Sequence, residues 1–148
     1  MNQPHAGLYK AYHRASHTVG KTRQVVMLYD GMIRFLQQAA EAIEKKDYEA
    51  RYHKLARVSD IIIGLQSCLD FEAGGPSAKG LYDFYAALDA RIFALHRSND
   101  LKACRAIIAE IKDMRDAWDG IDRGGEMKAQ GEAAKPAAGL PDSTTVSA

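Results

Sequence analysis

Apolar residues recur at intervals of three and four along the first long stretch of the chain. The stripe consists of Val25, Tyr29, Met32, Leu36, Ala39 and Ile43. A second apolar row lies one position earlier and widens the face, at Leu28, Phe35 and Ala42. This spacing is that of an α-helix, and an apolar face of this width is typical of a helix packed inside a bundle.

The pair Asp30-Gly31 falls in the middle of this stripe, although Asp-Gly is a strong turn signal. A turn here would scatter apolar positions that otherwise form one continuous face. The pattern therefore predicts that the helix continues through Gly31, at a cost of about 1 kcal/mol relative to alanine. We expect Gly31 to be a contact site, where the missing side chain lets another element approach. The sequence leaves open whether that partner lies inside the bundle or outside it.

Three further runs repeat the helical spacing and are separated by short breaker segments. The runs comprise Leu55, Val58, Ile62, Leu65 and Leu69; Leu81, Phe84 or Tyr85, Leu88, Ile92 and Leu95; and Leu101, Cys104, Ile107 or Ile108, Ile111, Met114 and Trp118. The breakers are "KKD" at 45–47, "GGPS" at 74–77 and "RSND" at 97–100, where Asn99 or Asp100 can cap the next helix. The fourth run stops at Gly120. Because short loops force neighbouring helices to run antiparallel, the sequence predicts an all-α fold, an antiparallel four-helix bundle over residues 21–122.

The two ends of the chain differ from the bundle in composition. Residues 1–20 form a polar arm that carries Leu8, Tyr9 and Tyr12, and such residues are able to dock on a groove. Residues 123–148 contain scattered Gly, Pro and Ala and no aromatic residue. Such a segment buries too little apolar area to offset its ordering entropy, so we expect a disordered tail.

Length and charge limit the classes of function. A chain of 148 residues, 47% apolar, is large enough for one domain with a core. The 20 basic residues nearly balance the 19 acidic ones, which disfavours a nucleic-acid partner. No run approaches the roughly 20 apolar residues of a membrane span, and the N-terminus lacks a signal-peptide core, so we expect a cytosolic protein. Cys68 and Cys104 are then reduced, and we expect both to be small apolar residues on helix faces.

No arrangement of residues predicts catalysis, a metal site or a cofactor. The segment "VGKT" at 19–22 ends like a phosphate-binding loop, but Ala15 stands where that motif needs glycine. Glu49 and His53 are more simply a solvated helix face, because a di-iron bundle requires Glu-x-x-His motifs that the chain lacks. Several aspartates fall beside arginines and are interpreted as surface charge: Asp113, Asp116, Asp119 and Asp122, beside Arg115 and Arg123.

Several segments resemble a known family in order and spacing. They are "VVMLYDGMIRFLQQAAEAIEKKD", "SCLDFEAGGPSAKGLYDFYAALDARI", "SND" and "MRDAWDGI". They resemble the flagellar secretion chaperone FliS family over roughly residues 8 to 121, with Leu28-Tyr29-Asp30-Gly31 among the most specific pieces. The chain departs from the family's usual pattern at Gly80, Ala87 and Leu95-His96.

The resemblance implies a helical bundle that is not an enzyme and that holds flagellin in the cytoplasm before export. Members bind the disordered C-terminal segment of flagellin, which wraps around the bundle and partly folds on it, so that flagellin cannot polymerise early. The resemblance also implies that the N-terminal arm covers part of this surface when the client is absent. Whether export or regulatory proteins share the surface is left open.

We expect the client groove and its support to include nine residues. They are Tyr9 and Tyr12 in the arm, Tyr29 and Gly31 in the first helix, Leu55 and Ile62 in the second, and Leu81, Tyr85 and Leu88 in the third. Surplus apolar surface on a small bundle suggests a partner. The alternative is an interaction or regulatory module that self-associates through the same apolar face.

Overall fold

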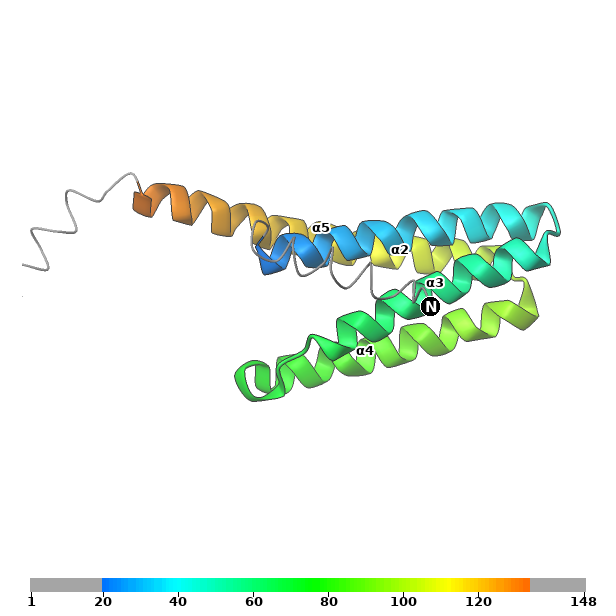
Figure 1. The fold of residues 1–148 in the computed structure, drawn as a ribbon, viewed down its shortest axis with the longest axis horizontal. Coiled ribbons are helices and arrows are strands. Elements are labelled where there is room, and N and C mark those ends of the chain that lie inside the picture. Colours follow the sequence, from blue (N-terminus) through cyan, green and yellow to red (C-terminus); the bar gives the residue numbers. More distant parts are fainter. Residues whose placement is uncertain (1–19, 134–148) are drawn as a thin grey trace, which may run out of the picture.

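The computed structural model describes the backbone of residues 20–133 and the side chains of residues 20–124. Four helices fill this part of the chain: α2 (Lys21–Glu44), α3 (Tyr48–Ser67), α4 (Phe71–Ser98) and α5 (Leu101–Ala133). Each helix reverses the direction of the one before it (Figure 1). The predicted all-α antiparallel bundle is therefore confirmed.

The four helices form two pairs. α2 lies along α5 and also packs on α3, while α4 packs mainly on α3 and approaches α5 only sparsely. In Figure 1 the α3–α4 pair converges with the α2–α5 pair at one end and diverges from it towards the loop between α3 and α4. The α3–α4 pair thus presents an outer face that no other described helix covers.

The core follows the predicted stripes. The fully buried side chains of the described residues come from all four helices, among them Tyr29, Met32 and Leu36 on α2, Leu55 and Ile62 on α3, Tyr85, Leu88 and Ile92 on α4, and Ile107 and Ile111 on α5. The two tyrosines meet at the centre, where their hydroxyl oxygens are 2.8 Å apart. Apolar periodicity therefore identified the residues that hold the bundle together.

Aspartates begin three of the helices. Asp47 accepts a hydrogen bond from the Ala50 N–H at 3.1 Å, and Asp70 accepts from two backbone N–H groups of α4, each at 3.0 Å. Asp100 accepts from the Ala103 N–H at 3.0 Å, so it caps α5, while Asn99 ends α4 in the left-handed conformation. These caps satisfy helix N–H groups that have no partner within the helix.

The "GGPS" segment interrupts the helical backbone as expected, and the break falls within the residues of α4. α3 already ends at Ser67, and α4 begins at Phe71 and continues through the segment with a kink at Gly75, where φ is 53° and ψ is −132°. A positive φ favours glycine, and Pro76 directly after it suits the first turn of the helical part that follows. The breaker residues therefore set the short helical piece at 71–74 apart from the rest of α4, and α3 ends well before them, at Ser67.

The last helix is longer than predicted. It does not stop at Gly120 but runs to Ala133. A glycine inside a helix costs only about 1 kcal/mol, and Glu, Met, Lys, Ala and Gln at 126–130 are strong helix formers. The remaining tail and the N-terminal arm, with Tyr9 and Tyr12, lie outside the described residues, so the expectations for them stay predictions.

Gly31 packs inside the bundle. A Cβ placed on it would lie 3.4 Å from Cδ1 of Ile61 on α3, which answers the question that spacing left open. We expect Gly31→Ala to be tolerated, because a methyl group just fits and alanine favours the helix. Gly31→Leu should destabilise the protein by about 1–3 kcal/mol through overpacking.

Urea unfolding of the two Gly31 variants measures this effect, and Gly64 on α3 supplies the control. A Cβ at Gly64 would meet nothing within 4 Å, so Gly64→Leu should not lower stability. Equal stability of Gly31→Leu and Gly31→Ala would contradict the close approach of α2 and α3.

Candidate functional site

Large apolar side chains are concentrated on the outer side of the α3–α4 pair. Six of the eight that the described residues expose belong to α3 and α4: Tyr48, Tyr52, Ile63, Phe71, Tyr82 and Phe93. The most exposed is Phe93, at 68%. Clustered apolar exposure of this kind marks a docking surface more often than single scattered residues do. We call the surface formed by Tyr52, Ile63, Phe71, Tyr82, Phe93 and His96 the α3–α4 face.

One end of the α3–α4 face is an aromatic cluster centred on His96. The His96 ring lies 5.4 Å from the Tyr52 ring and 6.0 Å from the Phe93 ring, measured between centroids. Partial burial and the nearby Arg51 charge lower the pKa of His96. Its imidazole is therefore neutral at pH 7, and the cluster presents three uncharged rings.

Polar contacts hold α3 and α4 together beneath this face. Ser59 donates to the Asp89 carboxylate at 2.6 Å, and the Gln66 amide donates to the Tyr82 carbonyl oxygen at 3.3 Å. At the loop end, Phe71 and Tyr82 meet edge to face with centroids 5.8 Å apart. The exposed rings are thus fixed relative to one another before any partner binds, which lowers the entropy cost of association.

A hollow opens on the outer side of α4 next to the aromatic cluster. It measures about 560 Å³ and is lined by Ala90, Phe93, Ala94, Arg97 and Ser98. The two alanines leave room beside the Phe93 ring, and Arg97 stands one helical turn further on. The hollow is therefore apolar on one side and cationic on the other.

Most of the predicted site residues lie beneath the surface. Five of them are at most 2% exposed and belong to the core: Tyr29, Leu55, Ile62, Tyr85 and Leu88. Gly31 is buried against Ile61, and Leu81 is partly buried at the edge of the core. These residues support the bundle whose surface carries the exposed aromatics, and their contact with a client stays a prediction.

Helical periodicity did not reveal the exposed aromatics, because it identifies only the residues of the buried stripes. Tyr52 and Phe93 are large aromatic residues on helix faces that are otherwise polar. Their presence there could have indicated a docking surface from the sequence. Cys68 was also misjudged, since it is exposed at the end of α3. Cys104 is buried as expected, and burial raises the pKa of its thiol.

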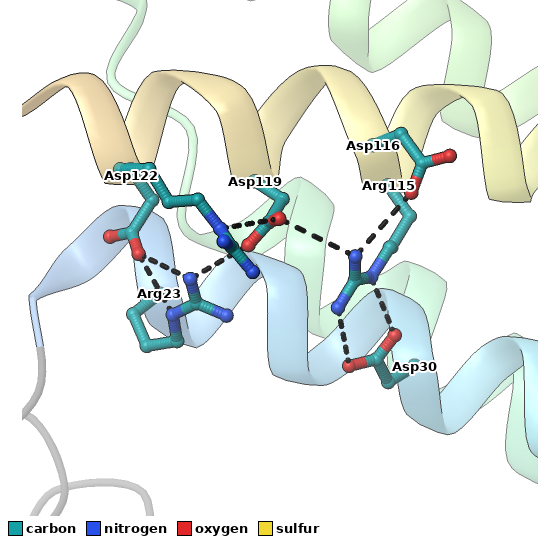
Figure 2. A network of polar contacts seen from close by, with 7 residues as sticks. Arg23, Asp30, Arg115, Asp116, Asp119 and Asp122 are labelled. Carbon is teal, nitrogen blue, oxygen red and sulfur yellow. Dashed lines mark hydrogen bonds and ion pairs between the residues drawn. The ribbon is translucent and has the colours of Figure 1, made fainter.

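Asp119 and Asp122 are not the surface charges that the sequence suggested. Arg23 on α2 donates to Asp119 at 2.7 Å and to Asp122 at 2.8 Å, and the Asp122 side chain is only 8% exposed. Arg115 on α5 donates to Asp30 on α2 at 2.9 Å (Figure 2). The partners are far apart in sequence, so spacing along one helix could not reveal them. The network ties the start of α2 to the second half of α5.

This network predicts a pH dependence of stability. The hydrogen bond from Arg23 is the main cause that lowers the pKa of Asp119 from 3.8. The carboxylate thus stabilises the fold fully above its unfolded pKa, and the contribution disappears as the pH falls through the lower folded pKa. We expect Asp119→Asn to be less stable than wild type at neutral pH, and the gap to close below about pH 4.

Thermal unfolding of both proteins across acidic pH measures this gap. Asp83→Asn is the control, because Asp83 pairs with Lys79 at 3.3 Å on an exposed part of α4, where ion pairs contribute little. A gap that is independent of pH would contradict the assigned role of Asp119.

The described residues lack the features of two other classes of site. None of their helices is long and apolar enough to cross a membrane. The same residues contain no group of three or more His, Cys, Asp or Glu side chains that could hold a metal ion.

The bundle and its exposed aromatic face are typical of a small helical protein that binds other proteins. The family model described as flagellar protein FliS matches residues 5–125. The chain belongs to this family, which confirms the resemblance seen in the sequence. Membership in a chaperone family implies a binding role rather than catalysis.

Individual relatives agree with the family match. The chain is 34% identical over 97 residues to the flagellar secretion chaperone FliS of Vibrio cholerae, covering 66% of this chain and 71% of that protein. It is 30% identical over 112 residues to the protein of the same name in Bacillus subtilis, covering 74% and 82%. A Campylobacter jejuni relative is 29% identical over 111 residues, covering 74% and 87%.

Proposed function

We propose that this chain is a cytosolic export chaperone that binds the disordered C-terminal segment of flagellin. Bound in this way, flagellin cannot polymerise early and stays competent for flagellar type III secretion. The observation that carries the proposal is the α3–α4 face, which exposes large apolar side chains along a helix pair. Family membership supports a flagellar client, and the relatives from V. cholerae and B. subtilis are named flagellar secretion chaperones.

The physical logic is that of coupled folding and binding. A disordered amphipathic segment gains affinity by burying apolar side chains and loses part of it to its own ordering. The fixed rings of Tyr52, Phe93 and Tyr82 supply apolar contact area on a surface that is already ordered. An amphipathic client helix meets such a surface with anchors spaced three and four residues apart.

The buried residues Tyr29, Gly31, Leu55, Ile62, Tyr85 and Leu88 then act as the support of the binding surface, with Leu81 at its edge. We propose that Tyr9 and Tyr12 of the N-terminal arm cover part of the surface in the absence of client. Export or regulatory proteins that use the same face would compete with flagellin.

Size-exclusion chromatography with the flagellin C-terminal segment from the same genome tests the proposal. We expect one-to-one co-elution at micromolar concentration, and no co-elution of flagellin that lacks this segment. Separate migration would count against the proposal. A concentration series of the chaperone alone distinguishes the alternative, because a self-associating module would form larger species without any client.

A further inference from the structure

The hollow on α4 has an asymmetric lining. Ala90, Ala94 and the Phe93 ring form its apolar part, while Arg97 supplies a cation one turn beyond Phe93. Phe93 is fixed from the other side by its ring contact with His96, 6.0 Å away. A side chain that enters the hollow therefore meets apolar atoms first and a guanidinium group next to them.

Arg97 differs from most other arginines of the described residues. Five of them pair with carboxylates: Arg23, Arg91, Arg105, Arg115 and Arg123. Arg51 hydrogen-bonds to Asn99 and lies over the Tyr48 ring, and Arg34 lies over the Phe35 ring. Among the described residues, neither Arg97 nor Arg57 has an ion-pair, hydrogen-bond or ring partner. Of these two, Arg97 lines the hollow beside Phe93, and Arg57 is not among the residues that line it.

The groups near Arg97 do not neutralise it. Asp100, three residues further on, uses its carboxylate to cap α5 by accepting from the Ala103 N–H. Asp89, two turns earlier on α4, accepts from Ser59 on α3. His96 adds no negative charge in either of its protonation states. The guanidinium therefore remains available to a carboxylate from outside.

We propose that Arg97 is a specificity-determining residue that selects a client helix carrying a carboxylate one turn from an apolar anchor. The anchor fills the hollow against Phe93, Ala90 and Ala94, and the carboxylate pairs with the Arg97 guanidinium. Phe93 and Arg97 are four residues apart on α4, so a client helix lying along α4 matches them with an anchor and an acid three or four residues apart. The planar guanidinium suits a carboxylate, because it can donate two parallel hydrogen bonds. This inference rests on the proposed function, since it names a feature of the client on the same face.

Isothermal titration with the flagellin C-terminal segment tests the inference in four chaperone variants. Arg97→Glu should weaken binding by at least about tenfold, since a like-charge contact replaces an opposite-charge one. Arg97→Ala should weaken it less and reduce its dependence on salt. Arg97→Lys should keep most of the affinity. Arg57→Glu makes the same charge change on an exposed site away from the hollow and should change affinity by no more than about twofold.

A charge exchange identifies the partner of Arg97. Each acidic residue of the flagellin segment is replaced in turn by lysine, and we expect one replacement to restore binding to Arg97→Glu while weakening binding to wild type. Circular dichroism of every variant shows whether the fold is intact. Absence of wild-type binding would overturn the proposed function itself. Wild-type binding with equal effects of Arg97→Glu and Arg57→Glu, or with no restoring replacement, would overturn only the role of Arg97.

Discussion

Replacing Tyr29 by phenylalanine should destabilise the bundle by about 1–3 kcal/mol, the usual cost of leaving a buried polar group without its partner. The Tyr29 and Tyr85 hydroxyls are 2.8 Å apart, and both residues are at most 2% exposed. Burial raises the pKa of each phenol, so both are neutral at any pH at which the protein is studied. Tyr29→Phe removes one hydroxyl and leaves the other without a hydrogen-bond partner.

Tyr29→Phe and Tyr85→Phe each leave one buried hydroxyl without its partner. Tyr85→Phe should therefore cost a similar amount, about 1–3 kcal/mol. The double variant removes both hydroxyls, so it should cost clearly less than the sum of the two single changes.

Urea unfolding measures all three variants, and the single tryptophan of the chain provides the fluorescence signal. Additive effects of the two changes would contradict the hydrogen bond between α2 and α4. This hydrogen bond joins α4 directly to α2, and α4 approaches α5 only sparsely.

Replacing Phe93 or Tyr52 by serine should weaken client binding by roughly thirtyfold for each change, because loss of a hot-spot aromatic costs about 2 kcal/mol. Phe93 is 68% and Tyr52 55% exposed, so neither contributes much to the core. The stability of the free chaperone should therefore change by less than about 0.5 kcal/mol.

Isothermal titration with the flagellin segment measures the loss, and Ile121 on α5 supplies a matched control. Ile121 is 60% exposed and lies outside the α3–α4 face, so Ile121→Ser should leave affinity nearly unchanged. If Ile121→Ser weakens binding as much as Phe93→Ser, the client uses the α2–α5 side, and the proposed location of the site is wrong.

The core residues of this fold could be predicted from the sequence, because residues that face the inside of a bundle recur with the period of a helix. Met32, Leu36, Ile62 and Ile92 were all placed by spacing alone, and each is 0% exposed. Helix ends were predicted less well. Gly75 and Pro76 are breakers by composition, yet a kink satisfies their backbone preferences as well as a loop does.

The candidate site was harder to predict because it depends on residues outside the period. Phe93 and His96 are neighbours three residues apart on α4, but Tyr52 meets His96 only when α3 and α4 pack side by side. That second contact cannot be predicted from the spacing along one helix. The pairing of Arg23 with Asp119 has the same origin, since the two lie on different helices at opposite ends of the described chain. Tyr29 and Tyr85 were expected in the client groove and its support. The structure places both in the core, and their contact with a client stays a prediction.

Site-specific photo-crosslinking tests most directly whether the α3–α4 face holds the client. A photoreactive phenylalanine analogue is placed at position 93 or 52 on this face, or at position 109 on the exposed side of α5, and the flagellin segment is added. The account predicts crosslinks to flagellin from positions 93 and 52 and none from position 109. Crosslinks from position 109 alone would show that the client binds the other side of the bundle.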